Sequence, residues 1–370
     1  TRIFGDDHPN TLTLRNNLAN CHLQAGRLDE AIQLYEQAAT GRARVLGDNH
    51  PLTLSTRNSL ADAYESAGRR VEAIQLYEQV ATGRARVLGE DHPLTLSTRN
   101  NLAYTYNAVG RLDEAIALYE QVATDRARVL GDNHPHTLNT RNSLADAYES
   151  AGRLDEAIAL YEQVVKGQTS VLGPDHPRTL ATRHSLAYAY ESAERLDEAI
   201  TLYEQVAQDQ ARVLGKDHPR TLNTCNNLAS AYASAERLDE AITLYEQVAQ
   251  DQARILGTDH PRTLTTLNNI AYTYRSVGRL PEAITLYEQV MKDQIRILGD
   301  NHPGTYNTRR ELADSYREAG RTDKSITLYE QLLVSSQRVL GDDHPFTMAM
   351  CEELEDVRRE LKQRDNPSAD

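Results

Sequence analysis

The sequence predicts an all-α protein, a solenoid of stacked antiparallel helix pairs, and three observations support that fold class. The dipeptide His-Pro recurs every 42 residues from His8 to His344, with no insertion or deletion. This one feature contains nine of the 12 histidines and nine of the 12 prolines. The aromatic residues are 19 Tyr, 2 Phe and no Trp. One local environment that is copied many times explains all three observations, as in a repeat array.

Each repeat carries the signals of two helices, as residues 131–172 illustrate. Gly131 suits a helix end, because glycine adopts left-handed backbone conformations without penalty, and Pro135 suits a first helical turn. Apolar residues at helical spacing predict a first helix over about 135–150 and a second over about 155–172. Neither helix can bury its apolar stripe alone, so we expect neighbouring repeats to stack.

The period predicts one solenoid domain over residues 1–363 and a disordered tail over residues 364–370. The expected helix pairs lie at about 9–46, 51–88, 93–130, 135–172, 177–214, 219–256, 261–298 and 303–340, and a capping helix at 345–363. Glu352, Glu353 and Arg358 suit the solvated outer face of a capping helix. Residues 1–5 read as the end of a preceding second helix, so we expect a fragment of a longer repeat protein.

The composition favours a cytoplasmic protein over several other classes. A net charge of −14 opposes binding to nucleic acid, which is itself negative. No apolar run approaches the ~18 residues that suggest a membrane span. The three cysteines, Cys21, Cys225 and Cys351, lie far apart and suit reduced thiols in the cytosol. We therefore expect neither nucleic acid nor a membrane among the partners.

No motif for catalysis, a metal or a cofactor stands out, and we expect none of the three. The periodic histidines could suggest metal sites, but successive ones are a whole repeat apart, too far to share an ion. His134 and His136 lie close in sequence, but no neighbouring Cys or carboxylate pattern completes a tetrahedral ligand set. Gly215-Lys216 lacks the other residues of a phosphate loop. The enzyme hypothesis therefore ranks last.

The repeats resemble a known family. The spacing of the tetratricopeptide repeat signature is reproduced by Leu144-Ala145, Tyr148, Gly152, Ala157, Tyr161 and Val164. The 42-residue period, the Leu-Gly-Asp-x-His-Pro junction and the Asn-Asn-Leu-Ala runs at Asn100 and Asn226 resemble the repeats of kinesin light chains and related bacterial proteins. The resemblance covers about residues 1–355. It implies a right-handed superhelix whose concave face, lined by the first helices, holds an extended peptide.

Positions that vary among near-identical repeats are the candidates for ligand specificity, and the resemblance places two such columns on the concave face. The first contains acidic residues and tyrosines, namely Asp62, Tyr104, Asp146, Tyr188 and Tyr272. Acidic residues precede arginines in the second column and its surroundings, namely Glu149, Glu191, Arg275, Arg310 and Arg317. A groove of mixed sign with interleaved tyrosines suits a peptide of opposite polarity along its length. The alternative is drift on a solvated face.

A third column is nearly constant and consists of Asn58, Asn100, Asn142, His184, Asn226 and Asn268. Asparagine is unfavourable inside a helix, by up to ~0.7 kcal/mol relative to alanine. Its amide both donates and accepts hydrogen bonds, so a ladder of asparagines could hold a peptide backbone whatever its sequence. The resemblance implies the same role. The alternative is that duplication alone has kept the column constant.

These observations predict a scaffold that binds a protein or an extended peptide in its concave groove. One alternative is the sensor arm of a larger nucleotide-driven signalling protein, since similar bacterial repeats often stand beside a nucleotide-hydrolysing switch domain. Another is a structural array that self-associates through its exposed ends.

Two local predictions accompany this function. An arginine column that includes Arg57 and Arg141 is a candidate to pair with the recurring Glu120 and Glu162 column. The turns at Glu194 and Glu236, where other repeats have glycine, are predicted weak spots.

Overall fold

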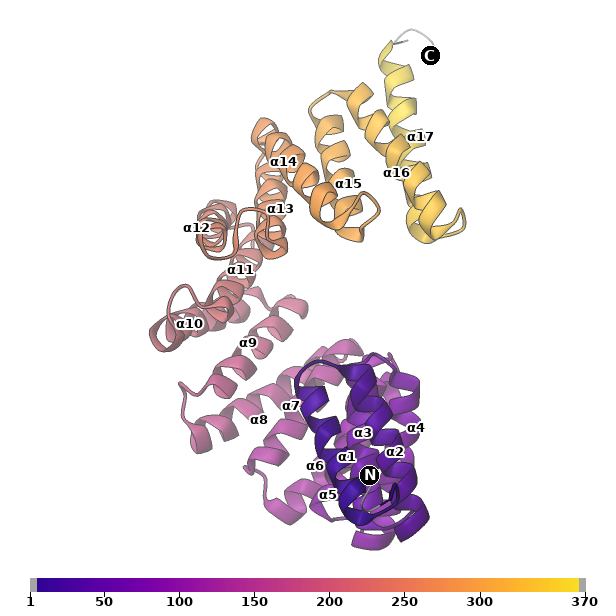
Figure 1. The fold of residues 1–370 in the computed structure, drawn as a ribbon. Coiled ribbons are helices and arrows are strands. Elements are labelled where there is room, and N and C mark those ends of the chain that lie inside the picture. The colour runs from indigo at the N-terminus through magenta and orange to yellow at the C-terminus, as the bar shows by residue number, and fades with distance from the viewer. Residues whose placement is uncertain (1–4, 366–370) are drawn as a thin grey trace. The chain divides into compact units, whose positions relative to one another are not determined.

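The computed structural model describes residues 5–365, which form 17 helices and no strand (Figure 1). The first helices of the repeats are α1 Pro9–Gln24, α3 Pro51–Ser66, α5 Pro93–Ala108, α7 Pro135–Ser150, α9 Pro177–Ser192, α11 Pro219–Ser234, α13 Pro261–Ser276 and α15 Pro303–Glu318. The second helices are α2 Leu28–Leu46, α4 Arg70–Leu88, α6 Leu112–Leu130, α8 Leu154–Leu172, α10 Leu196–Leu214, α12 Leu238–Leu256, α14 Leu280–Leu298 and α16 Thr322–Leu340. The final helix is α17 Pro345–Asp365. The predicted all-α array of helix pairs is confirmed.

The end of the chain differs from the expectation. Helix α17 continues to Asp365, so the predicted disordered tail is wrong for residues 364 and 365. The helix still has favourable residues there and meets no glycine or proline before Pro367. Residues 366–370 of the predicted tail lie outside the described residues.

The chain divides into two compact units, and each is described by itself. Unit 1 ends at Ala189 and unit 2 begins at Tyr190, so the boundary falls within α9. Consecutive helices pack against one another from α1 to α8 in unit 1 and from α10 to α17 in unit 2. The single solenoid domain over residues 1–363 remains a prediction.

The core of each unit lies between helices of adjacent repeats. In unit 1, Ile74 and Tyr77 of α4 share a buried cluster with Leu102 and Tyr106 of α5. In unit 2, Tyr287 of α14 shares one with residues of α13 and α15. Burying one such side chain contributes roughly 1.5–3 kcal/mol. Because each cluster needs residues from two repeats, an isolated repeat would leave its stripe in water.

The His-Pro junctions are helix caps. The backbone of His50 is extended, and its Nδ1 accepts a hydrogen bond from the backbone N–H of Leu52 at 3.2 Å. Pro51 follows as the first helical residue, where no N–H is needed. The same bond, at 3.1 to 3.2 Å, is made by His8, His50, His92, His134, His176, His218, His260, His302 and His344. Histidine here takes the place of the usual Ser, Thr or Asp cap.

The turns between the two helices of a repeat need a left-handed residue. Gly68 and Gly110 occupy such turns with φ of 74° and 79°. Glu194 and Glu236 have φ of 59°, and they are the only residues other than glycine with positive φ between residues 5 and 365. A side chain in this conformation costs roughly 1 kcal/mol relative to glycine. The backbone strain that the prediction assumed at Glu194 and Glu236 is therefore present.

The arginine column pairs differently from the prediction. Arg57 donates to Asp48 at 2.5 Å and Arg141 to Asp132 at 2.5 Å, so each partner is the acidic residue of the preceding junction. Glu120 instead accepts a hydrogen bond from the Tyr148 hydroxyl at 2.6 Å. The acidic residue of the junction lies nine residues before the arginine, next to the start of the helix that carries the arginine. The glutamate of the predicted pair lies on a second helix.

The corrected pairing agrees with two exceptions in the arginine column, although Arg183 is kept where Pro174 replaces the junction acid. Cys225 and Leu267 replace arginine in the repeats where the junction acid is replaced by Lys216 and Thr258. An arginine beside Lys216 would meet a like charge. One beside Thr258 would have no carboxylate at that junction.

Candidate functional site

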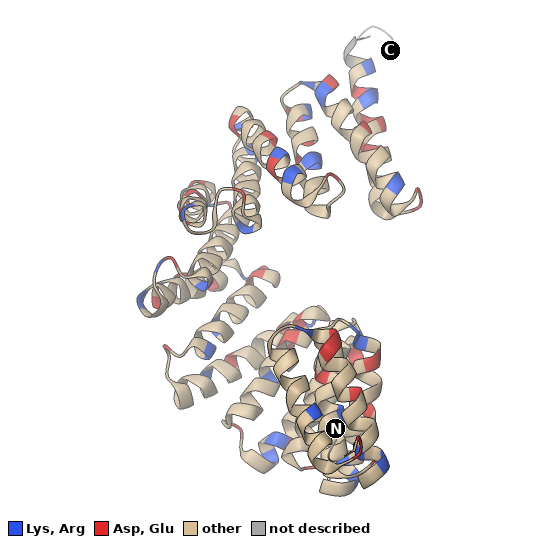
Figure 2. Ribbon diagram, in the orientation of Figure 1, with Lys and Arg blue, Asp and Glu red and all other residues tan. Residues whose placement is uncertain are grey.

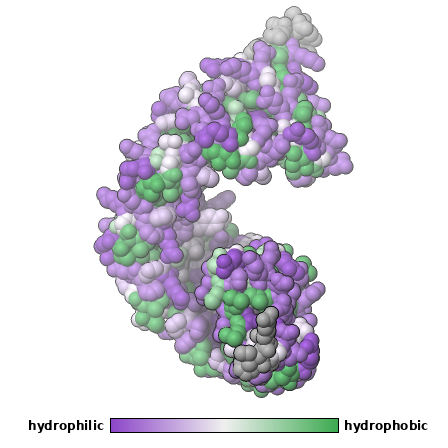
Figure 3. Space-filling model, viewed as in Figure 1, coloured by the Kyte–Doolittle hydropathy of each residue, from purple (hydrophilic) through white to green (hydrophobic). Residues whose placement is uncertain are grey.

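The surface of the described residues is mixed in charge and hydropathy. Lys and Arg alternate with Asp and Glu along the helices without a long stretch of one sign (Figure 2). Apolar residues form separate patches between polar ones on the visible face (Figure 3). Between residues 5 and 365, no group of three or more His, Cys, Asp or Glu side chains could hold a metal ion. None of the described helices is long and apolar enough to cross a membrane.

The candidate site is the side of the first helices that carries the three predicted columns, which we call the first-helix face. Its asparagines form a ladder inside the protein. The Oδ1 of Asn58 accepts from the hydroxyl of Thr98 at 3.0 Å, and the Oδ1 of Asn100 accepts from Thr140 at 2.9 Å. The same bond, at 2.9 to 3.1 Å, joins Thr182 to Asn142, Thr266 to Asn226 and Thr308 to Asn268. One half of each amide therefore links adjacent repeats.

The other half of the amide is bound only in some repeats. Asn58 donates from Nδ2 to Asp62 at 3.1 Å, and Asn142 donates to Asp146 at 3.2 Å. Asn100 and Asn226 have no carboxylate four residues later. Their Nδ2 groups have no hydrogen-bond partner among the described residues. His184, in the same column, is half-buried, and burial lowers the pKa of its imidazole.

Asp62 and Asp146 are held by neutral donors. Besides Asn58, Asp62 accepts from Asn101 at 3.2 Å and from the hydroxyl of Tyr77. Asp146 accepts in the same way from the hydroxyl of Tyr161. Burial raises the pKa of both carboxyl groups, and the hydrogen bonds only partly offset it. Neither forms an ion pair within the described residues.

Glu149 and Glu191 occupy a similar environment. The Tyr161 hydroxyl, which donates to Asp146, also lies 3.2 Å from a carboxylate oxygen of Glu149, and Tyr203 donates to Glu191 at 3.1 Å. Burial raises the pKa of both glutamates. The acidic half of the predicted groove is thus a set of partly buried carboxylates that bond hydroxyl and amide groups of their own chain.

The arginines of the predicted basic half are paired within unit 2. Arg275 contacts Glu311 at 2.6 Å and Glu318 at 3.3 Å. Arg317 contacts Glu353 of α17 at 3.1 Å. Arg310 lies 2.9 Å from Glu311. The pairs of Arg275 and Arg317 join α13 to α15 and α15 to α17, whereas the pair of Arg310 lies within α15. All three charges are therefore less available to a ligand than the sequence suggested.

Three tyrosines of the first column are open to solvent. Tyr104, Tyr188 and Tyr272 are 53%, 46% and 51% exposed. Fifteen other tyrosines belong to two structural columns. Tyr106, for example, donates to Glu78 at 2.6 Å under the guanidinium of Arg111, and Tyr119 is fully buried. The exposed tyrosines therefore supply aromatic surface that the fold does not use.

Sequence reasoning missed a column on the second helices that reaches between the first helices. In unit 1 it contains Arg42, Arg84 and Arg126, each about 5–6% exposed. The guanidinium of Arg84 donates to the hydroxyl of Thr98 at 2.6 Å, to Asn58 at 3.1 Å and to the backbone oxygen of Leu94 at 3.1 Å. Burial lowers the pKa of Arg84. From α8 to α14 the column is glutamine, namely Gln168, Gln210, Gln252 and Gln294, and in α16 it is Ser336.

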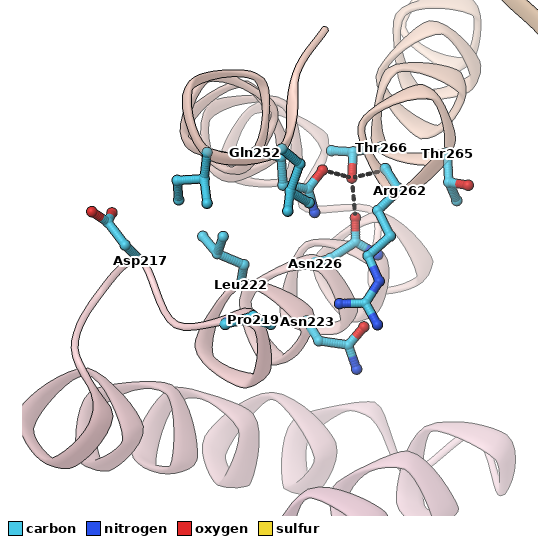
Figure 4. A pocket seen from close by; sticks show the side chains of 11 residues that line it. Asp217, Pro219, Leu222, Asn223, Asn226, Gln252, Arg262, Thr265 and Thr266 are labelled. Carbon is cyan, nitrogen blue, oxygen red and sulfur yellow. Dashed lines mark hydrogen bonds between the residues drawn. The ribbon is translucent and has the colours of Figure 1, made fainter. Parts of the chain in front are cut away.

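In unit 2 the shorter glutamine leaves a small cavity. Thr266 donates toward Asn226 at 3.0 Å and Gln252 at 2.9 Å, beside a space of about 110 Å³ (Figure 4). Arg262 lies along the same space, where Leu94 stands at the matching position in unit 1. Three of the four repeats with glutamine carry arginine on the exposed start of the next first helix, at Arg178, Arg220 and Arg262, and the fourth has Gly304 there. The sequence contained a signal for this column, because the two changes occur together in three repeats.

A larger hollow lies on the first-helix face of unit 2. Its volume is about 560 Å³, and α11, α12 and α13 line it. Ser230 and Ala233 stand there in place of the larger residues of the two variable columns. Tyr272 forms one wall, and Tyr245 also lines the hollow. Of the predicted site residues, only Tyr272 lines this hollow.

Comparison with known proteins agrees with this architecture. The tetratricopeptide repeat family model matches residues 1–42, 16–84, 71–126, 94–170, 151–208, 186–250, 223–295 and 262–334. A crystal structure of nearly identical TPR-like repeats from a putative kinesin light chain of Podosopora anserina is 39% identical, with a TM-score of 0.51. The match covers 55% of this chain and 97% of that one. No curated protein matches the chain.

Two more distant structures share the fold alone. A signal transduction ATPase of the STAND class with a tetratricopeptide repeat sensor, from Pyrococcus horikoshii, is 13% identical with a TM-score of 0.64. That match covers 94% of this chain and 50% of the other. A Rap protein complexed with competence and sporulation factor is 10% identical with a TM-score of 0.52, covering 96% and 99%. From its fold, its period and these matches, the chain belongs to the tetratricopeptide repeat family, and its repeats are similar to those of kinesin light chains.

Proposed function

We propose that this protein is a cytoplasmic interaction scaffold whose first-helix face binds an extended peptide or a segment of a partner protein. Tetratricopeptide repeats build protein-interaction surfaces, and the first helices carry the side chains that vary between these repeats. One observation supports the choice of face above the others. Tyr104, Tyr188 and Tyr272 expose about half of their surface on three first helices, although Arg275 lies near the ring of Tyr272.

The surrounding contacts suggest how a ligand would be divided between fixed and selective contacts. Asn100 and Asn226 each keep an amide N–H₂ that can donate to a peptide carbonyl, whatever the peptide sequence. The tyrosines offer large and rigid aromatic surface, which is typical of residues that dominate binding energy. The ion pairs of Arg275 and Arg317 make an acidic ligand compete with Glu311 and Glu353. We therefore assign selectivity mainly to the tyrosines.

Two alternatives remain as proposals of lower rank. The resemblance to the repeat sensor of a STAND ATPase supports a sensor arm of a larger signalling protein. A Rap protein of similar fold is complexed with competence and sporulation factor, which supports the binding of another molecule by this fold. Self-association through the ends of the array is the other alternative, and light scattering over a concentration series distinguishes it from binding by a monomer.

The proposal is tested by selecting peptides from a random library on the immobilised full chain and measuring the best binder by calorimetry. We expect Tyr104→Ala, Tyr188→Ala and Tyr272→Ala each to weaken binding, by about tenfold for the tyrosine at the centre of the site. Val71→Ala and Val334→Ala are matched controls, because both valines are 65% exposed but lie on second helices. If the valine variants lose affinity and the tyrosine variants keep it, the binding face is wrong.

A further inference from the structure

We infer that the hollow between α11 and α13 of unit 2 binds one basic side chain, lysine or arginine, of the ligand peptide. This inference rests on the proposed function, since it assigns the chemistry of one subsite on the proposed binding face. It is independent of the arginine column and of the small cavity beside Gln252.

The hollow exists because two residues on α11 are small. Position 230 is serine where other repeats have Asp62, Tyr104 or Asp146, and position 233 is alanine where others have Glu149 or Arg275. The resulting space of about 560 Å³ lies within the range of pockets that bind small ligands. It is ample for one long side chain of a peptide that runs along the face.

The lining selects a polar occupant. The lining includes the polar residues Ser234, Asn269, Thr273 and Ser276, and Leu238 is its largest aliphatic residue. The hydroxyls of Thr273 and Ser276 donate to backbone oxygens of α13, so their oxygen atoms can still accept. An apolar side chain would remove water from these groups without replacing the lost hydrogen bonds. An ammonium or guanidinium group brings several donors to the hydroxyl and amide oxygens of the wall.

The charge at the hollow is negative. Glu236 lines it, is exposed, and forms no ion pair with a described residue. Its neighbour Arg237 is engaged elsewhere, since it lies over the Tyr232 ring and pairs with Glu240. No Lys or Arg belongs to the lining. A cation in the hollow would therefore meet a carboxylate that has no cation of its own.

A second carboxylate, that of Glu191, lies close to the hollow, where it bonds the lining residue Ser230. Glu191 of α9 is partly buried, and it accepts hydrogen bonds from the side chains of Tyr203 and Ser230. Ser230 also lines the hollow. Burial raises the pKa of Glu191, so its negative charge is poorly solvated where it stands. A nearby cation would stabilise that charge.

The aromatic wall suits the same occupant. Tyr272 is half exposed, and the negative face of a tyrosine ring attracts cations. The guanidinium of Arg275 already lies 5.6 Å from the centre of this ring. Its charge is balanced by Glu311 and Glu318, so it does not make the hollow positive. An acidic side chain, in contrast, would be opposed by Glu236 and Glu191 together.

The test uses three blocked tripeptides, Gly-Lys-Gly, Gly-Gln-Gly and Gly-Glu-Gly, titrated into the isotope-labelled full chain and followed by nuclear magnetic resonance. We expect the lysine peptide alone to shift the signals of Ser234, Tyr272 and Ser276 in the millimolar range. Glu236→Gln should weaken the affinity for the lysine peptide about two- to fivefold, as expected for a solvent-exposed charge pair. Added salt should also weaken this affinity.

Glu194→Gln is the matched control, because Glu194 has the same turn and the same φ of 59° but does not line the hollow. Ser230→Tyr is a second variant, which fills the hollow with the residue found at positions 104, 188 and 272 and should abolish the shifts. Equal binding of the lysine and glutamine peptides, or an unchanged affinity in Glu236→Gln, would overturn the inference.

The outcomes separate this inference from the proposed function. If peptides of any charge shift signals on the first-helix face, the face binds peptides and only the preference for a basic side chain is wrong. If the library-selected peptide shifts signals on second helices only, the proposed binding face is wrong as well.

Discussion

The second helices α2, α4 and α6 of unit 1 fill the space between successive first helices with a buried arginine, whereas α8 and the unit 2 helices α10, α12 and α14 place a glutamine there. Arg84 reaches Thr98, Asn58 and the backbone of Leu94 from α4. Gln252 of α12 reaches only Thr266 and borders a cavity of about 110 Å³. The asparagine and threonine of the first helices thus bond a buried charged side chain in one set of repeats and a neutral side chain in the other.

The difference teaches that near-identical repeats can differ in how rigidly their first helices are joined. A guanidinium that bonds two helices at once fixes their spacing, but it must give up most of its water. A glutamine avoids that cost and makes fewer bonds. In unit 2, ion pairs between first helices, such as Arg275 with Glu311, provide links that are closer to the surface. The hollow at Tyr272 occurs in unit 2.

The largest expected effect is on the buried arginine. Arg84→Ala should lower the free energy of unfolding by about 2–4 kcal/mol, because it leaves a cavity and removes a donor from three oxygen atoms. Arg84→Gln, which copies unit 2, should cost about 1 kcal/mol or less, since the glutamine amide can still form a hydrogen bond with Thr98. Urea denaturation measures both. Equal losses of unfolding free energy in the two variants would mean that glutamine cannot replace arginine between α3 and α5.

The second effect concerns the two strained turns, both of which lie in unit 2. Glu194→Gly with Glu236→Gly should stabilise the protein by about 2 kcal/mol in total, because both residues have φ of 59°. The melting temperature should rise. Gly110→Ala, in a unit 1 turn with φ of 79°, is the reverse control and should lower it. A fall in the double variant would show that these glutamates make contacts worth more than the strain.

The third effect is a pH dependence in unit 1. Burial raises the pKa of Asp62 and Asp146 above the ordinary value of 3.8. The folded state then holds these protons more tightly than the unfolded state, so the stability that they contribute falls as pH rises above about 4. Asp62→Asn with Asp146→Asn removes this dependence. The difference in unfolding free energy, variant minus parent, should therefore grow from pH 4 to pH 7. A constant difference would contradict the burial argument.

The smallest effect concerns the corrected arginine pairing. Thr258→Asp with Leu267→Arg gives one repeat of unit 2 the pair that Asp48 and Arg57 form in unit 1. A surface pair contributes only a few tenths of a kcal/mol. The double variant should be slightly more stable than the sum of the two single variants, as a double-mutant cycle measures. Strict additivity would show that the pair has no energetic value.

The sequence was sufficient for the fold because the repeat makes every local signal occur many times. The His-Pro period locates the starts of the first helices, and the glycines locate their ends. The structure adds the reason, since the histidine is itself the cap, as at His50. Nothing in the spacing alone indicates that an imidazole would accept the backbone N–H.

The candidate site was predicted less well, because its contacts join residues 26 to 40 positions apart. Asn58 meets Thr98 and Arg84 only when α3, α4 and α5 are packed. The same holds for Arg275 and Glu311, which lie on successive first helices. Sequence columns show which positions vary, and they placed Tyr104, Tyr188 and Tyr272 among the candidates. They do not show which polar groups are already bonded within the chain.

The most direct test of the central proposal is to map where a bound peptide touches the protein. A library-selected peptide that carries a photoreactive phenylalanine analogue is crosslinked to the full chain, and mass spectrometry identifies the modified residues. We predict crosslinks on first helices, near Tyr104, Tyr188 or Tyr272, that disappear when excess unlabelled peptide is added. Crosslinks concentrated on second helices, for example around Val71 or Val334, would contradict the proposal.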